Sequence, residues 1–215
     1  YDLTATLLND GRVLAAGGGS LASAELYQVV QPDTTPPVIT PQVSGTLGNN
    51  GWFLSNVTVS WTVTDAESSI TSSSGCDTST VTSDTAGVTF TCTATSAGGT
   101  ASASVTVKRD ATPPTITGSR TPAPNANGWN NGPVTVSFAC NDSLSGVASC
   151  TAGQTIATEI VALSIAGVAV DLAGNNASAT VGPINIDLTP PTISASQIPA
   201  ANGNGKGLTT FQAGG

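Results

Sequence analysis

The chain has 215 residues, with 13 acidic side chains, 5 basic side chains, no histidine and a net charge of −8. This charge repels the phosphates of nucleic acids and anionic membranes, so neither nucleic acid binding nor membrane insertion is expected. The lack of histidine excludes Ser-His-Asp and Cys-His nucleophile systems and histidine-containing metal triads, and we therefore expect no enzyme and no catalytic residue.

The segment 1–32 contains short strand-forming stretches, TATLL at 4–8, DGRVLAAGG at 10–18 and SAELY at 23–27. This pattern is similar to part of a bacterial Kelch repeat, in which a glycine doublet follows the second strand of a propeller blade. A Kelch blade needs about 50 residues and several neighbouring blades. The segment is therefore either the end of a propeller that lies upstream or a set of strands with another use.

A short motif, Asp-x-Thr-Pro-Pro, begins at Asp33, Asp110 and Asp187, so that it occurs three times at a constant offset of 77. The repeat predicts one domain at 33–110, a second at 111–187, and the start of an incomplete third at 188–215. The Pro-Pro pairs stiffen the junctions, because proline fixes its backbone and donates no hydrogen bond. Since methionine is absent, we expect the chain to be a processed or excised part of a larger protein.

Within each repeat the apolar residues alternate with hydroxyl residues. In VTVSWTVTD (57–65) and VTVSFACND (134–142) every second side chain is large and apolar, the pattern of a strand with one buried face. Turn-forming glycine and asparagine residues separate several such strands. The sequence therefore predicts an all-β fold of tandem β-sandwiches.

The order TPPxI, NGW, VTVSWTVTD or VTVSFACND, then ATSAGG or VDLAGNNAS, resembles bacterial immunoglobulin-like repeats and covers about residues 36–191. This resemblance implies a secreted or cell-surface protein in which the modules serve as stalks, spacers or adhesive domains. The longest apolar run, residues 160–170, is far shorter than the roughly 20 residues of a membrane helix and is interpreted as one or two buried strands.

The four cysteines fall as Cys76 and Cys92 in the first repeat and Cys140 and Cys150 in the second. Metal ligation would require closer pairs and a shared geometry. We therefore predict one disulfide in each module, which implies an oxidising compartment, although two buried free thiols in each module are the alternative. A bridge closing about 15 residues contributes roughly 3 kcal/mol to the stability of a small domain.

Acidic residues near the module ends are candidates for a calcium site, in which carboxylates act together with backbone carbonyls. Turn capping is the competing interpretation, because the chain has no dense DxDxDG run. Asp65 and Glu67 could also form a glycosidase-like carboxylate pair, but their position between a strand and a turn favours capping. No residue is assigned to a cofactor, and the calcium candidates are Asp65, Asp142 and Asp171.

Three functions follow as expectations. The first is a non-catalytic structural or adhesive segment of a secreted bacterial surface protein, a stiff rod or spacer that contacts a protein or glycan. The second is a subunit of an extracellular filament, assembled head-to-tail by β-strand donation between the unmatched ends of the chain. The third is an accessory region of a secreted Kelch-propeller enzyme, similar to secreted copper oxidases, whose active site lies outside this chain.

Overall fold

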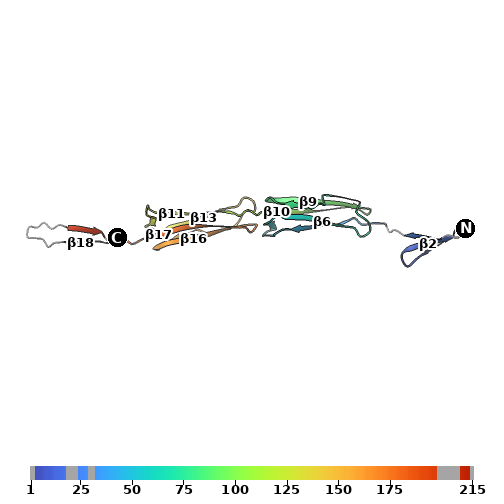
Figure 1. Cartoon of the computed structure of the whole chain (residues 1–215). Coiled ribbons are helices and arrows are strands. Elements are labelled where there is room, and N and C mark those ends of the chain that lie inside the picture. The colour runs from blue at the N-terminus through green and yellow to red at the C-terminus, as the bar shows by residue number, and fades with distance from the viewer. Residues whose placement is uncertain (1–2, 18–23, 29–31, 198–208, 214–215) are drawn as a thin grey trace, which may run out of the picture. The chain divides into compact units, whose positions relative to one another are not determined.

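The computed structural model describes residues 3–17, 24–28, 32–197 and 209–213, and these residues form an all-β structure (Figure 1). The chain divides into two compact units, Tyr1–Ala111 and Thr112–Gly215. None of the described segments forms a helix long and apolar enough to cross a membrane.

The first described strands pair only with one another. β1 (Leu3–Leu7), β2 (Arg12–Gly17) and β3 (Ala24–Gln28) form an antiparallel sheet in the order β1-β2-β3. Leu7 is 70% exposed and Tyr27 is 54% exposed, and the buried core residues among the described ones all lie after β3. This sheet therefore has an exposed apolar surface and no core of its own among the described residues.

Module 1 is the part of the first unit built from β4 to β10, and it consists of two facing sheets. The strands are β4 (Val38–Ser44), β5 (Trp52–Phe53), β6 (Val57–Thr64), β7 (Ser72–Ser74), β8 (Ser79–Val81), β9 (Thr85–Ser96) and β10 (Gly99–Arg109). One sheet has the order β4-β6-β8, and the other has the order β5-β10-β9-β7. The pair β5–β10 is parallel, whereas the other pairs are antiparallel.

The two sheets of module 1 enclose a small core. Val57 and Val59 of β6, Val81 of β8 and Val107 of β10 form one buried cluster, and Phe53, Trp61 and Phe90 pack against it. Because these side chains come from both sheets, module 1 is a β-sandwich. The alternation of valine with threonine along 57–64 thus places valine between the sheets and threonine toward solvent.

Module 2 is built from β11 to β17 and repeats this architecture. Its strands are β11 (Thr115–Thr121), β12 (Trp129–Asn130), β13 (Val134–Asn141), β14 (Val147–Cys150), β15 (Gln154–Ile156), β16 (Ile160–Asp171) and β17 (Asn176–Ile186). The sheet orders are β11-β13-β15 and β12-β17-β16-β14, and β12 again pairs in parallel with β17. The core is formed by Val134, Val136, Ile165, Val181, Ile184 and Ile186.

The repeat is not uniform. Strand β13 starts at an offset of 77 from β6, β16 at an offset of 75 from β9, and β17 again at an offset of 77 from β10. Module 2 is therefore shorter than module 1 between β13 and β14 and longer by the same amount in the turn between β16 and β17. Residues from β7 to β9 must be matched to module 2 at an offset of 75.

The prediction that residues 160–170 form one or two buried strands is wrong in one respect. They form the single strand β16, whose side chains alternate, so that Ile165 and Ala169 are buried whereas Val161 is 68% exposed and Val168 is 45% exposed. Only one face of β16 packs against the core, because its sheet lies at the surface of the sandwich.

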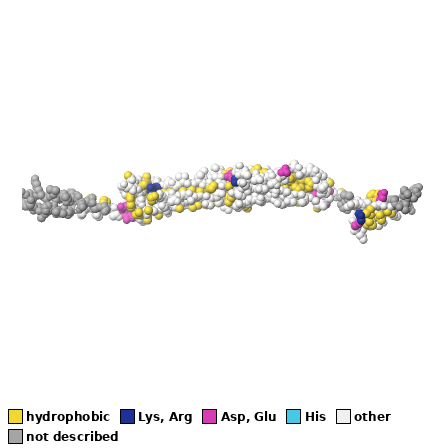
Figure 2. Space-filling view, in the orientation of Figure 1, with side chains coloured by type: hydrophobic (Ala, Val, Ile, Leu, Met, Phe, Trp, Pro, Cys, Tyr) yellow, Lys and Arg dark blue, Asp and Glu magenta, His cyan; other side chains and the backbone are white. Residues whose placement is uncertain are grey.

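The outer face of module 1 carries paired hydroxyl groups along the β9–β10 hairpin. Four cross-strand pairs, 2.7 to 2.9 Å apart, follow one another: Thr89 with Thr106, Thr91 with Ser104, Thr93 with Ser102, and Thr95 with Thr100. On the face seen in Figure 2 the charged side chains form only small scattered groups on the two modules. On this surface hydroxyl groups thus take much of the place that charged side chains commonly have in contact with water.

Each module contains one disulfide, in the pairing that the sequence predicts, but the bridges connect different elements. Cys76 follows β7 and joins Cys92 of β9, in the same sheet, with Cα atoms 4.5 Å apart. Cys140 of β13 joins Cys150 of β14 across the two sheets, with Cα atoms 5.9 Å apart. Both modules have one cysteine in or next to the corresponding strands β7 and β14. The second cysteine lies on β9 in module 1 and on β13 in module 2, and these two strands do not correspond.

Beyond module 2 the described residues form one antiparallel pair, β18 (Ile193–Gln197) with β19 (Thr209–Ala213). The predicted third module at 188–215 lies only partly within the described residues, because 198–208 and 214–215 are not among them.

Candidate functional site

The candidate metal ligand Asp65 lies in a cluster of polar side chains at one end of module 1, together with Asp33, Glu67, Ser68 and Ser96. We call this the junction cluster, because Asp33 opens the Asp-x-Thr-Pro-Pro segment that enters the module. Asp33 Oδ2 accepts hydrogen bonds from the Ser68 hydroxyl (2.5 Å) and the Gly98 N–H (2.6 Å), and Oδ1 accepts one from the Thr35 N–H (3.1 Å). The junction is thereby attached to the β9–β10 turn by a side chain.

Hydrogen bonds hold Asp33 and Asp65 of the junction cluster in the ionised form. The Ser68 hydroxyl, together with the Gly98 and Thr35 N–H groups, lowers the pKa of Asp33 to about 2. The backbone N–H groups of Ser68 and Glu67 lower the pKa of Asp65, against the opposing effect of the nearby Asp33 charge. Two carboxylates are therefore close enough to repel each other, and both carry charge at neutral pH.

The two carboxylate oxygens of Asp65 differ in their hydrogen bonding. Its Oδ1 accepts from the N–H groups of Glu67 (2.8 Å) and Ser68 (3.0 Å), whereas Oδ2 is buried and has no hydrogen-bond partner. Glu67 Oε2 accepts from the Thr34 N–H at 2.7 Å. Asp65 and Glu67 thus both bind backbone N–H groups, which is the turn-capping role that the sequence favours over a glycosidase-like pair.

The other two calcium candidates, Asp142 and Asp171, belong to module 2 and lie together. Oxygen atoms of their carboxylates are within 4.8 Å of each other. Asp142 follows β13 and accepts from the N–H groups of Leu144 (3.1 Å) and Gly146 (2.7 Å). Asp171 ends β16, is fully buried, and accepts from the N–H groups of Gly174 (2.6 Å) and Asn175 (2.8 Å).

The corresponding ends of the two modules therefore carry different polar residues. Asp142 matches Asp65 at an offset of 77, and Asp171 ends its strand where Ser96 ends β9. By the repeat, Asp110 holds the position of Asp33, and in the first unit its N–H donates to Phe53 O at 2.9 Å. Hard cations such as calcium prefer carboxylate oxygens, and module 2 carries the carboxylate of Asp171 where module 1 has the hydroxyl of Ser96.

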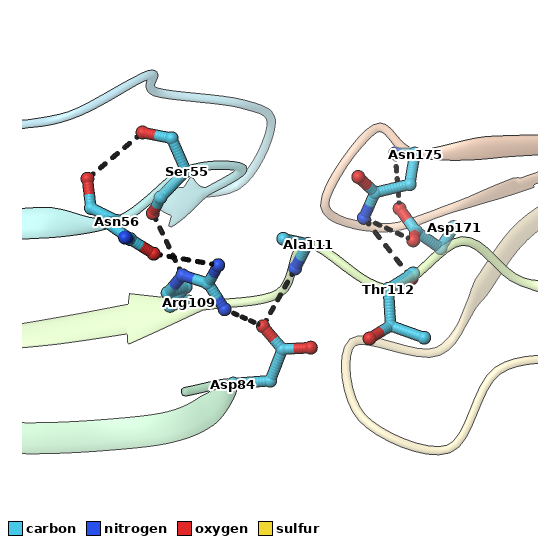
Figure 3. A network of polar contacts seen from close by, with 8 residues as sticks. All are labelled: Ser55, Asn56, Asp84, Arg109, Ala111, Thr112, Asp171 and Asn175. Carbon is cyan, nitrogen blue, oxygen red and sulfur yellow. Dashed lines mark hydrogen bonds and ion pairs between the residues drawn. The ribbon is translucent and has the colours of Figure 1, made fainter. Parts of the chain in front are cut away.

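A second polar network lies at the opposite end of the module 1 strands, where Arg109 ends β10 (Figure 3). Its guanidinium donates to Ser55 O (3.0 Å) and Asn56 Oδ1 (3.2 Å) and forms an ion pair with Asp84. Asp84 Oδ1 also accepts from the Ala111 N–H at 3.0 Å. The Arg109 and Asp84 side chains are 12% and 23% exposed, so this ion pair is partly shielded from solvent.

In module 2, Figure 3 shows a separate network around Asn175. The Asn175 amide donates to Asp171 Oδ2 (2.8 Å) and to Thr112 O (3.4 Å), and thereby connects the β16–β17 turn to the start of the second unit. Neither network resembles the arrangement of a nucleophile and a base.

Comparison with known proteins adds no identification: no family model, no curated protein and no solved structure matches this chain.

Several of these residues could not be selected from the sequence alone. Ser68 and Arg109 act on groups that are distant in the sequence, Asp33 and Asp84. One feature of the sequence did point to Asp33: it opens a motif that occurs three times at a constant offset.

Proposed function

We propose that the chain is a non-catalytic structural or adhesive segment of a secreted bacterial surface protein, in which tandem immunoglobulin-like modules act as a stiff spacer. The observation that carries the proposal is the attachment of the Asp-x-Thr-Pro-Pro segment by the Asp33 side chain. A junction with two prolines and a side chain bonded to the module has little freedom to bend, and this is the property that a spacer requires.

The strand order supports the immunoglobulin-like part of the proposal. Each module has seven strands, in sheets of three and four, and a short strand that pairs in parallel with the last strand. A seven-strand sandwich of three and four strands is the architecture of constant-type immunoglobulin domains. The intradomain disulfides support an extracellular location, since such bridges persist in oxidising compartments.

Stiffness can be tested by pulsed electron paramagnetic resonance with one spin label on β6 of module 1 and one on β13 of module 2. Labels at Thr62 and Thr135, introduced by cysteine substitution, should give a narrow distance distribution. Replacing Pro113 and Pro114 with serine should broaden it, whereas replacing Pro41 with serine, inside β4, should not. A broad distribution of label distances in the chain with both prolines intact would contradict the proposal of a stiff spacer.

A second candidate, an accessory region of a Kelch-propeller enzyme, is supported by the β1-β2-β3 sheet. It is an antiparallel meander in which Gly17, with a φ of 106°, ends the second strand. Six or seven Kelch-like repeats upstream in the parent gene would favour this candidate, and their absence would remove it.

A further inference from the structure

The corner that Arg109 occupies in module 1 has a counterpart in module 2. Asp84 directly precedes β9, and Glu159 directly precedes β16. Asp84 accepts from the N–H of Ala111, and Glu159 accepts at 3.1 Å from the N–H of Leu188, which is the repeat equivalent of Ala111. The two acids therefore hold the same place and the same backbone bond in their modules.

The cations of this corner are present in module 1 and absent from module 2. In module 1 Arg109 pairs with Asp84, and the Lys108 ammonium lies 5.0 Å from the centre of the Trp52 ring. The matching residues in module 2 are Ile186 and Asn185, both uncharged, while the tryptophan is kept as Trp129. None of the salt bridges among the described residues includes Glu159.

Module 2 has a pocket at this corner. Its volume is about 450 Å³, and it is lined by Trp129, Glu159, Ile160, Val161, Ile186 and Asp187. Glu159 uses Oε1 for the Leu188 N–H and the Thr189 hydroxyl, and Asp187 uses Oδ1 for the Thr189 N–H. The other oxygen of each carboxylate is left for a ligand, beside apolar walls and an aromatic ring.

We propose that this pocket binds the guanidinium group of an arginine side chain from a partner protein. The apolar walls suit the methylene stem of arginine, and the two carboxylates and the tryptophan suit its charged planar head. Arginine fits better than lysine because its flat fork can stack on a ring and donate to two carboxylates at once. In module 1 the chain's own Arg109 pairs with the acid and its Lys108 covers the tryptophan, and module 2 takes the cation from outside.

The probe for the test is N-acetyl-L-arginine amide, titrated into the whole ¹⁵N-labelled chain and followed by NMR. We expect saturable shifts of the Trp129 indole N–H and of the Glu159 and Val161 amides, with the Trp52 indole unchanged because Lys108 covers its ring. The uncharged isostere N-acetyl-L-citrulline amide should bind at least about tenfold more weakly, since it lacks the charge. Equal shifts with both compounds, or no saturable shift, would overturn the proposal.

Three variants make the test specific. Glu159→Gln keeps the acceptor for Leu188 and removes the charge, and it should weaken arginine binding by about tenfold or more. Asp77→Asn removes the same charge from an exposed site in module 1 and should leave binding unchanged. The Arg109→Ala variant should gain a second set of shifts, at the Asp84 corner. Loss of binding in Asp77→Asn as large as that in Glu159→Gln would show that only net charge matters and would refute the pocket. The outcome does not depend on whether the chain is a spacer.

Discussion

The Ser68 hydroxyl donates a 2.5 Å hydrogen bond to Asp33, a residue that precedes the first strand of module 1. The bond joins the segment before that strand to the turn after β6, and the Gly98 N–H adds a third segment to the same carboxylate. Three separate segments therefore depend on one ionised group at the entrance of the module.

This dependence predicts a loss of stability in acid. The pKa of Asp33 is about 2 in the folded chain and 3.8 at its ordinary value, so the unfolded state binds the proton more tightly. The stabilising contribution is therefore complete above about pH 4 and is lost as the pH falls through 2. Chemical unfolding of module 1, measured from pH 5 to pH 2, should show this decline. The part of the decline that is due to Asp33 should be missing in the Asp33→Asn variant and present in the Asp77→Asn control. If the free energy of unfolding falls equally with pH in the native chain and in Asp33→Asn, the assignment to Asp33 is contradicted.

The two disulfides should stabilise their modules by similar amounts, although they connect different elements. Their sequence separations are 16 and 10, for which chain entropy gives about 3 kcal/mol each. The double variants Cys76→Ala/Cys92→Ala and Cys140→Ala/Cys150→Ala should each lower the melting temperature of one module, as seen by calorimetry. Peptide mapping without reductant should find no bridge between modules. Four alkylatable thiols in the native protein would refute both pairs.

The sequence predicted the elements of the fold better than their connections. Alternation along 57–64 and 134–141 identified strands and their buried faces, because period 2 follows directly from strand geometry. The constant offset of the Asp-x-Thr-Pro-Pro motif predicted a repeated module. It could not reveal the local offset of 75, since the two changes in loop length cancel over the repeat. The match between Asp84 and Glu159, and hence the module 2 pocket, became visible only once the strands were placed.

Single side chains were harder to predict for the same reason. Asp142 and Asp171 are far apart in sequence and adjacent in space, because β13 and β16 end at the same end of module 2. Asp65 is a candidate by the same criterion, a place near a module end, and its carboxylate neighbour in module 1 is Asp33. Composition indicates which chemistry is available, and topology decides which residues share it.

The hydroxyl pairs of the β9–β10 hairpin should stabilise module 1 modestly. A cross-strand polar pair contributes about 0.2–1 kcal/mol, and exposure to water keeps the value low. A double-mutant cycle with Thr91→Val and Ser104→Ala should give a coupling energy in this range. The cycle of Thr91→Val with Ser102→Ala, which do not form a hydrogen-bonded pair with each other, is the control and should give about zero. Equal coupling in both cycles would show that the pairs do not act individually.

Calcium binding at Asp142 and Asp171 predicts a ligand-dependent melting temperature for module 2. An ion that binds only the folded state stabilises it by mass action, so millimolar calcium should raise the melting temperature and chelator should reverse the rise. The Asp142→Asn variant retains an oxygen for the turn and should lose the response, whereas Asp77→Asn should retain it. Melting that is unchanged by calcium and by chelator would leave turn capping as the role of both residues.

The filament hypothesis concerns the strands at the start of the chain. β1, β2 and β3 pair with one another and expose Leu7 and Tyr27 on one face and Leu26 on the other, so apolar side chains and the outer edges of this sheet are offered to a second copy. If those strands add to the terminal strands of the next molecule, the contact is head-to-tail and generates an open filament. Electron microscopy of the intact chain should then show fibres, and deletion of residues 1–30 should abolish them. A variant with Leu7→Lys and Tyr27→Lys, which changes one face of this sheet, should shorten the fibres if that apolar face takes part, because buried charge opposes association. Fibres that persist after the deletion would rule out strand donation from this end.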